Sequence, residues 1–314
     1  MNELFEFRGA IRAGLLVWMM ELIGGCSGAL PQPQPFVRDE ANRLNERGLE
    51  AARRGYKSVA VTAFGDAYQR YAAVEYFPGM VTALINSARV NMGQDDLAAV
   101  QKALKEARTL VKFTPSLAAE VSFENAKLLL RQGKAAEALV WSQQALSMAD
   151  QAAHGRMINL VAEIRFRLGE YEQADALASN SLTLAMAGSD RPEQANALRL
   201  LAECALARGK QTTAESRFNE ALAIDKELAL SARIATDLRG LARTAEQAGQ
   251  REHAMGYWKR AANVSLTGTD QTNAVASLER LALLHEQAGD AASAARVRAR
   301  IGEVIKIGRG NVER

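Results

Sequence analysis

Residues 192–225 decide the fold of this chain and read PEQANALRLLAECALARGKQTTAESRFNEALAID. In the first half, apolar residues recur at i, i+3, i+4 and i+7, which is the spacing of one helix face. These residues are Leu198, Leu201, Ala202 and Ala205. Gly209 then ends the helix, because glycine adopts the left-handed conformation of a helix C-terminus at little cost. The second half has a similar face, made by Ala214, Phe218, Ala221 and Leu222. The stretch therefore predicts two helices joined by a short turn.

The same pattern recurs along the chain with a fixed period of 40 residues. It is marked by Gly169, Gly209, Gly249 and Gly289. Alanines fall five positions after these glycines (Ala174, Ala214, Ala254, Ala294) and seven positions before them (Ala162, Ala202, Ala242, Ala282). A fixed period with small residues at fixed phases is typical of a stacked repeat array, in which each unit packs on its neighbours. The richness in alanine and leucine favours helices over strands.

This unit resembles the tetratricopeptide repeat, a helix–turn–helix with small residues at its eighth, twentieth and twenty-seventh positions and a large one at the twenty-fourth. Those positions hold Ala202, Ala214, Ala221 and Phe218, and in the next unit Ala242, Ala254, Ala261 and Trp258. The resemblance covers residues 38–301 in about seven units. It implies an all-α solenoid coiled into a right-handed superhelix, with helices longer than usual because the family period is about 34 residues. An irregular helical bundle is the alternative.

Residues 1–25 differ from the repeats and have the organisation of an export signal. Arg8 and Arg12 precede a short apolar run, residues 13–23, whereas a membrane span needs about 20 apolar residues. Ile23-Gly24-Gly25-Cys26 resembles a bacterial lipobox. The resemblance implies cleavage before Cys26 and acylation of that residue, which would anchor the protein in a membrane. An unprocessed amphipathic N-terminus is the alternative.

Two further segments flank the array. Residues 26–37 contain Pro31, Pro33 and Pro35 in alternation with other residues, a pattern incompatible with a helix or a central strand. This Pro/Gln stalk is expected to be an extended, polyproline-like spacer. Residues 302–314 are expected to form a C-terminal tail.

No pattern in the sequence indicates catalysis. His154, His253 and His285 are far apart, and none belongs to an HExxH motif or a Cys/His cluster. The chain also contains no phosphate-binding glycine motif and no nucleophile elbow. We therefore expect no enzymatic activity, no cofactor and no metal site. The formal net charge of +3 is too small to indicate a nucleic-acid partner.

The resemblance also implies where a partner would bind. In this family the first helices line a concave groove through the second, fifth, ninth, twelfth and thirteenth positions of each unit. These positions select Glu120, Phe123, Lys127, Arg131, Arg156, Asn159, Glu163, Phe166, Asn196, Arg199, Glu203, Arg239, Arg243 and Glu246 as candidate binding residues. Such a mixture suits an extended peptide or a helix. Arg199, Arg239 and Arg243 are expected to form a basic stripe that favours an acidic segment. The carboxylate clamp of chaperone-binding members is not reproduced, and a merely solvated inner wall is the alternative.

The order of signal, stalk and repeats leads to a functional hypothesis. We expect a lipid-anchored scaffold or adaptor of the cell envelope, on the periplasmic face of the outer membrane, that holds another protein or peptide in its groove. A narrower form resembles the outer-membrane tetratricopeptide lipoproteins that help to assemble type IV pilus secretins. The alternative is a cytoplasmic regulator whose repeats sense a peptide.

Overall fold

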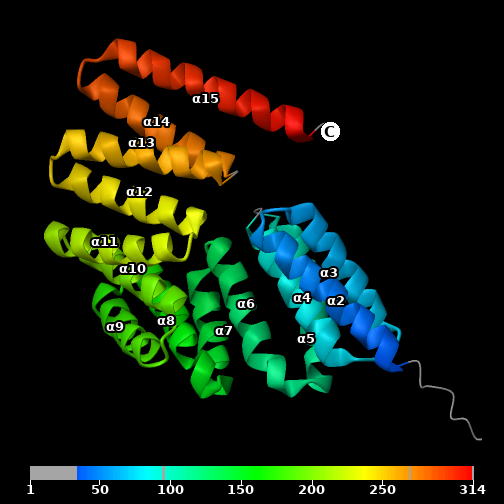
Figure 1. The fold of residues 1–314 in the computed structure, drawn as a ribbon. Coiled ribbons are helices and arrows are strands. Elements are labelled where there is room, and N and C mark those ends of the chain that lie inside the picture. The colour runs from blue at the N-terminus through cyan, green and yellow to red at the C-terminus, as the bar shows by residue number, and fades with distance from the viewer. Residues whose placement is uncertain (1–33, 94–95, 269, 313–314) are drawn as a thin grey trace, which may run out of the picture.

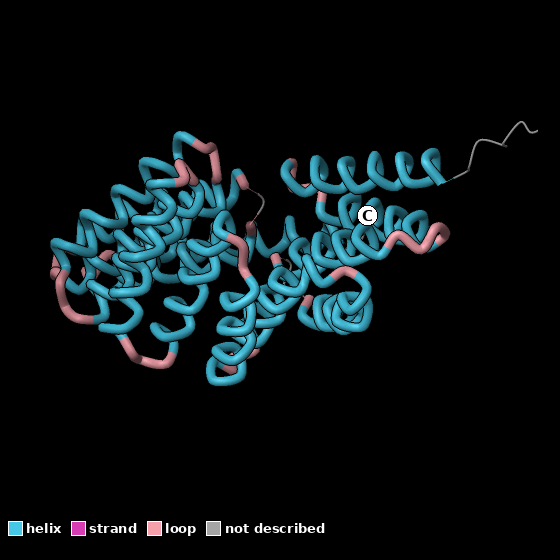
Figure 2. Tube along the Cα trace, turned by 90° about the horizontal axis from the view of Figure 1, so that it is seen from below, coloured by secondary structure: helices cyan, strands magenta, loops and turns pink. Residues whose placement is uncertain are grey.

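The computed structural model describes residues 34–93, 96–268 and 270–312, and its regular elements in these ranges are all helices (Figure 2). The α-helices are α2 (Gln34–Arg53), α3 (Lys57–Ala72), α4 (Phe77–Met92), α5 (Leu97–Leu110), α6 (Ala118–Arg131), α7 (Ala135–Met148), α8 (Gln151–Arg167), α9 (Tyr171–Ala187), α10 (Arg191–Ala207), α11 (Gln211–Glu227), α12 (Ser231–Gln247), α13 (Arg251–Thr267), α14 (Gln271–Gln287) and α15 (Ala291–Val312). Two short 3₁₀ helices, η1 (Val111–Phe113) and η2 (Pro115–Leu117), connect α5 to α6.

Consecutive helices form hairpins, and the hairpins stack one after another (Figure 1). Within the described residues, seven such pairs run from α2/α3 to α14/α15. From α8 to α14 every helix has 17 residues, and turns such as residues 208–210 and 228–230 complete the 40-residue period. The predicted fold class, an all-α solenoid of about seven helix–turn–helix repeats coiled into a right-handed superhelix, is confirmed.

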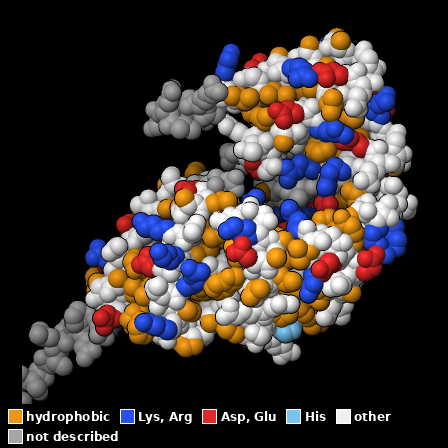
Figure 3. All heavy atoms as spheres, turned by 180° about the vertical axis from the view of Figure 1, so that it is seen from behind, with side chains coloured by type: hydrophobic (Ala, Val, Ile, Leu, Met, Phe, Trp, Pro, Cys, Tyr) orange, Lys and Arg blue, Asp and Glu red, His pale blue; other side chains and the backbone are white. Residues whose placement is uncertain are grey.

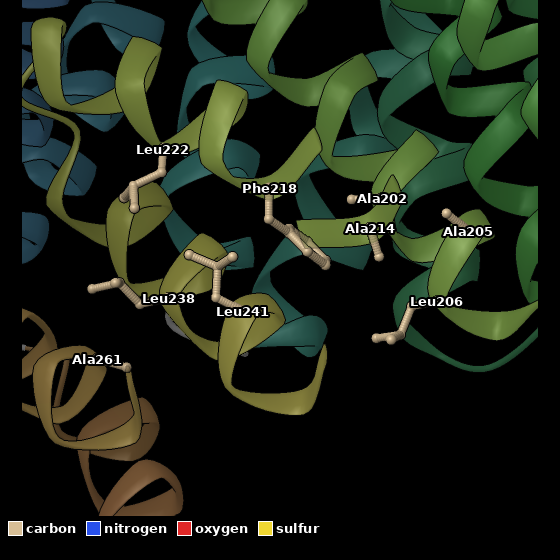
Figure 4. Packing of buried hydrophobic residues seen from close by; sticks show 9 residues of the cluster. All are labelled: Ala202, Ala205, Leu206, Ala214, Phe218, Leu222, Leu238, Leu241 and Ala261. Atoms are coloured by element: carbon tan, nitrogen blue, oxygen red, sulfur yellow. The ribbon is translucent and has the colours of Figure 1, made fainter. Parts of the chain in front are cut away.

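The small residues of the repeat pattern lie where helices pack closely. Ala202, Ala214 and Ala221 have no exposed surface, and the equivalent alanines of the neighbouring repeats are buried too. Figure 4 shows Phe218 pointing from α11 into the cluster formed with α10 and α12. A Cβ atom on Gly240 would lie 2.3 Å from the Phe218 ring, so the ring fits only against a glycine at this crossing. Small residues therefore set the distance between helices, as the spacing predicts.

The turns within repeats use glycine in the left-handed conformation. Gly209, for example, has φ = 68°, and Gly169 has φ = 82°. Gly93 is an exception because it ends α4 with φ = −72°. Between repeats, non-glycine residues such as Ala229 (φ = 54°) occupy left-handed positions. Such residues carry a steric cost that glycine avoids.

The array is less regular in its N-terminal part. Helices α4 to α7 have 14–16 residues, and η1 and η2 interrupt the stacking between the second and third repeats. Figure 1 shows α2–α5 as one arm and α12–α15 as another, with α6–α11 between them. In the space-filling view the two arms border a deep hollow, and Lys and Arg side chains gather inside it (Figure 3).

The expected boundaries of the array need correction at both ends. Helix α2 begins at Gln34, so residues 34–37 of the expected stalk are helical. Pro35 lies in the first turn, where its missing N–H leaves no helical hydrogen bond unmade. At the other end α15 continues to Val312, so residues 302–312 extend the last helix instead of forming a tail. The lipobox, including Cys26, lies outside the described residues. No helix among those described is long and apolar enough to cross a membrane.

Candidate functional site in the concave groove

A cavity of ≈ 840 Å³ follows the inner wall of the solenoid. It is lined by the first helices of five consecutive repeats, α4, α6, α8, α10 and α12, with Asp190 at the start of α10. Its lining residues are Arg89, Phe123, Glu124, Lys127, Arg156, Asn159, Leu160, Glu163, Phe166, Arg167, Asp190, Pro192, Glu193, Asn196, Arg199, Leu200, Glu203, Arg233, Thr236 and Arg243. We call this cavity the groove. Its position on the first helices is what the family resemblance implies.

One end of the groove carries a cluster with more cations than carboxylates. Arg89 from α4 donates to Glu124 (2.6 Å) and to Glu120 (2.7 Å) of α6. Lys127 binds the second oxygen of Glu124 at 3.0 Å, and Arg156 from α8 binds Glu120. These five side chains, called the N-terminal cluster, connect three successive repeats by ion pairs. Charge-assisted hydrogen bonds of this kind fix the relative position of the helices that supply them.

The environment of Glu124 shows how this cluster is balanced. The Glu124 side chain is fully buried, and burial alone would raise its pKa. Lys127 and Arg89 outweigh that effect, and the pKa of Glu124 is lowered as a result. The carboxylate is thus kept ionised by two cations. Phe123 completes the cluster, because Arg156 lies 4.6 Å and Lys127 5.4 Å from its ring centroid. With 7% of its surface exposed, Phe123 supports the cations and offers little area to a ligand.

The opposite balance holds between the fifth and sixth repeats. Arg199 of α10 binds Asp225 near the end of α11 and donates from Nε to Asp237 of α12 at 2.6 Å. Both aspartates are fully buried, and only 15% of the Arg199 side chain is exposed. We call these three residues the C-terminal cluster. Desolvation raises the pKa of Asp237 to about 7, and the nearby Asp225 carboxyl adds to the shift while Arg199 opposes it.

Between the two clusters the groove floor offers polar groups beside apolar ones. Arg199 donates to the Asn196 oxygen (3.1 Å), and the Asn196 amide donates to Glu193 (3.0 Å). The Oδ1 atom of Asn159 is buried without a hydrogen-bond partner among the described residues. Leu160, Leu200 and Phe166 line the same cavity. Amides that alternate with apolar side chains can bind a peptide backbone and its side chains together.

Most of the sequence-predicted site residues lie in the groove, and four do not. Those that line it are Phe123, Lys127, Arg156, Asn159, Glu163, Phe166, Asn196, Arg199, Glu203 and Arg243. Glu120, Arg131 and Arg239 are outside its lining, although Glu120 binds the lining residues Arg89 and Arg156. Glu246 lines a second cavity of ≈ 600 Å³, where it accepts hydrogen bonds from Trp258 (2.6 Å) and Arg280 (2.9 Å). Arg243 lines both cavities, so the second continues the groove toward the last repeat.

The expectation of a basic stripe is wrong. Arg199 is bound by two aspartates, Arg243 by Glu203, and Arg239 by the Asn273 side chain. A guanidinium already paired with a carboxylate contributes little net charge to a ligand. The sequence could not show this pairing, since each acceptor except Glu203 lies at a position that the groove phases do not select.

Several groove residues escaped the sequence analysis. Glu124, Leu160 and Leu200 all occupy the sixth position of their units, a phase that also faces the cavity here. Arg167 and Thr236 do lie at expected groove phases, so the sequence could have selected them. Arg89 belongs to the unit around Gly93, whose repeat pattern is weak. Asp225 comes from a second helix, and no rule about first helices finds it.

Within the described part of the chain, no group of three or more His, Cys, Asp or Glu side chains could hold a metal ion. The carboxylates of both clusters are engaged by arginine or lysine. The chemistry available is hydrogen bonding, ion pairing and apolar contact.

Comparison with known proteins agrees with this architecture. Residues 152–227 match the family model described as tetratricopeptide repeat. This segment covers the fourth and fifth repeats, which belong to the regular part of the array. No curated protein matches the chain by sequence. The family match is thus confined to residues 152–227, where the sequence is similar to tetratricopeptide repeats.

Solved structures share the fold at low sequence identity. A Rap protein in complex with competence and sporulation factor has a TM-score of 0.65 and 15% identity, over 85% of this chain and 76% of that one. BtubC (BKLC) from P. vanneervenii has a TM-score of 0.56 and 20% identity, over 69% and 92% of the two chains. PilW, a type IV pilus biogenesis factor, has a TM-score of 0.51 and 18% identity, over 70% and 91%. At these identities the likeness concerns the fold alone.

Proposed function

We propose that this tetratricopeptide-repeat array is a scaffold or receptor that holds a segment of another protein in its groove. The observation that carries the proposal is the cavity along five consecutive first helices. Packed helices lie about 8–10 Å apart, so five of them extend over roughly 35 Å. An extended peptide rises about 3.3 Å per residue, and about ten residues would fill that length. A stretch of chain suits such a groove better than a compact small molecule does.

The side chains of the groove indicate which kind of protein segment it can bind. Its arginines are largely paired, so a strongly acidic segment gains little from them. Asn159 and Asn196 provide amide groups, and Leu160 and Leu200 provide apolar surface. We therefore expect a segment of mixed character, bound through its backbone and a few apolar side chains, with a small net charge.

Site-directed crosslinking tests where a partner binds. A photo-crosslinking residue at position 159 lies in the groove, and the same residue at position 219 is exposed on α11, a second helix. After illumination in cells that produce the full chain, a specific adduct is expected from position 159 and none from position 219. Adducts from position 219 alone, or equal adducts from both, would contradict groove binding. The crosslinked peptide, identified by mass spectrometry, names the partner.

We further propose that the protein is held at the cell envelope by a lipid on Cys26. The support is the lipobox resemblance in the sequence, and the PilW structure shows that a protein of pilus biogenesis uses the same fold. Intact mass of the protein isolated from its native cells should correspond to loss of residues 1–25 and addition of acyl chains. A Cys26→Ala variant should keep its full length and leave the membrane fraction.

The second candidate is a cytoplasmic regulator that senses a peptide. The observation in its favour is the structural likeness to a Rap protein, which is described in complex with a competence and sporulation factor. This candidate requires residues 1–25 to remain attached, so the same mass measurement separates the two. An unprocessed, unlipidated chain favours the regulator and removes the anchored form.

A further inference from the structure

The joint between the fifth and sixth repeats contains one more buried acid than it has cations. Asp225 and Asp237 have no exposed surface, and Arg199 is the cation bound to both. The Arg199 Nη2 atom reaches Asp225 and also lies 3.4 Å from Asp237 Oδ2, so both carboxyls bind the same nitrogen. Two buried carboxylates beside one guanidinium would leave an uncompensated charge in a dry site, which is costly.

An unused acceptor lies in the same place. Asp225 Oδ1 is buried and has no partner among the groups placed in the structure. A buried carboxylate oxygen without a donor is rare, because its desolvation is not repaid. A proton on Asp237 removes both problems, since it cancels the excess charge and supplies an O–H that can donate to Asp225. Desolvation is the largest cause of the raised pKa of Asp237, and the nearby Asp225 carboxyl raises it further.

The neighbouring charges leave this pair without a second cation. From α10 the facing charged group is Arg199. The other basic residues of α12 are engaged elsewhere: Arg233 donates to the Pro192 carbonyl, Arg239 to Asn273, and Arg243 binds Glu203. No described side chain of α13, which packs against α12, donates to either carboxyl. The charge of the two carboxyls is therefore compensated by Arg199 and by a bound proton.

We infer that Asp225, Asp237 and Arg199 form a proton-dependent joint: the Asp237 carboxyl holds a proton that it donates to Asp225, and loss of this proton as the pH rises loosens the contact between the fifth and sixth repeats. Arg199 is hydrogen-bonded to Asn196, and Asn196 to Glu193, so the joint is continuous with the groove floor. The shape of the groove therefore changes with pH, whatever ligand it binds.

The sign of the effect follows from proton linkage. The pKa of Asp237 is raised in the folded chain from 3.8 to about 7, so the folded state binds the proton more tightly than the unfolded state. The contribution of Asp237 to stability is then fully present at low pH and is lost as the pH rises through the folded pKa. The unfolding constant rises tenfold per pH unit between the two pKa values and less near the folded one, so it should rise about fiftyfold between pH 5 and pH 7.

Infrared spectroscopy detects the proton directly. At pH 6 the full-length wild-type protein should show the carbonyl stretch of a protonated carboxylic acid, and part of this band should vanish in Asp237→Asn. The matched control is Glu124→Gln, which removes another fully buried carboxyl that has two cations, and it should remove none of the band. Identical bands in wild type and Asp237→Asn at pH 6 would overturn the inference.

Denaturant unfolding at pH 5 and pH 7 gives the second readout. The wild type should lose about fiftyfold in the folding constant over this range, and Asp237→Asn, which mimics the protonated form, should lose far less. An equal loss in both proteins would overturn the inference. If Asp237→Asn does not fold, Asp225→Asn replaces it. The absence of any protonated-carboxyl band from the wild type at pH 6 refutes the joint without any variant.

Discussion

The N-terminal and C-terminal clusters of the groove use the same kinds of side chain with opposite charge balance. In the first, Glu120 and Glu124 are matched by Arg89, Lys127 and Arg156. In the second, Asp225 and Asp237 share Arg199. Burial acts to raise the pKa of both carboxyls; two cations outweigh it at Glu124 and lower the pKa, whereas at Asp237 burial and the Asp225 carboxyl outweigh the single Arg199 and raise it. The comparison teaches that the number of cations bound to a fully buried carboxyl decides the direction in which its pKa moves.

The largest loss of stability is expected when Arg199, the cation of the C-terminal cluster, is removed. Arg199→Ala leaves two fully buried carboxyls without a cation, and loss of one partner of a buried pair costs about 3–5 kcal/mol. In Arg89→Ala, Glu124 keeps Lys127 and Glu120 keeps Arg156, so a smaller loss of about 1–2 kcal/mol is expected. Denaturant unfolding at pH 7 measures both. Equal losses would mean that charge balance does not distinguish the clusters.

Lowering the pH should weaken the N-terminal cluster, whereas raising it should weaken the C-terminal cluster. Because the folded pKa of Glu124 is lowered, its stabilising contribution is present above the unfolded value of 4.5 and is lost as the pH falls through the folded value. Glu124→Gln is expected to cost about 1–3 kcal/mol at pH 7 and progressively less below pH 4.5. Unfolding curves of wild type and variant from pH 7 to pH 3 provide the test. A difference that does not shrink in acid would contradict the assignment.

Replacing Phe123, the aromatic residue of the N-terminal cluster, should cause a smaller loss of stability that does not depend on pH. Phe123→Leu removes the face on which Arg156 and Lys127 lie, and each such contact is worth about 0.5–1 kcal/mol. Together with the lost volume we expect a destabilisation of about 1–2 kcal/mol. The value should be the same at pH 5 and pH 8, as measured by denaturant unfolding. A strong dependence on pH would show that the ring tunes the carboxylates as well.

The smallest effect is expected from relieving backbone strain in the turn that joins the fifth and sixth repeats. Ala229 lies in the turn between α11 and α12 with φ = 54°, a conformation that glycine adopts without strain. Ala229→Gly is expected to stabilise the protein by about 0.5–1 kcal/mol. Because no titrating group is changed, the gain should be equal at pH 5 and pH 8 in thermal unfolding. An unequal gain would couple turn strain to the proton of the aspartate pair.

The repeat architecture was readable from the sequence because it depends on local spacing. The alanines that pack between helices, such as Ala202 and Ala214, recur at fixed phases and are buried as expected. The lining of the groove was readable in part, since a phase rule finds Arg199 on a first helix. Its partners could not be found in this way, because Asp225 comes from a second helix and Asp237 from the next repeat. Whether a charged side chain is paired depends on contacts between repeats, and the superhelical stacking sets those contacts.

The ends of the array departed from expectation for a local reason. Alternating prolines argued for an extended stalk up to residue 37, yet Pro35 lies within the first turn of α2. A proline disfavours a helix only beyond its first turn. The position of the helix start therefore decides the effect of the residue, and that position depends on packing between α2 and α3.

Contacts in this molecule are made mostly between helices adjacent along the chain (Figure 1). The shape of the opening between the two arms therefore depends on how each repeat packs on the next, at every joint along the coil. Because the joints follow one another along the coil, a rotation of a few degrees at each of them would add up to a large displacement of its two ends. Tension applied to the two ends would widen the aperture gradually, and an occupant lying along several turns would stiffen the coil against that stretch.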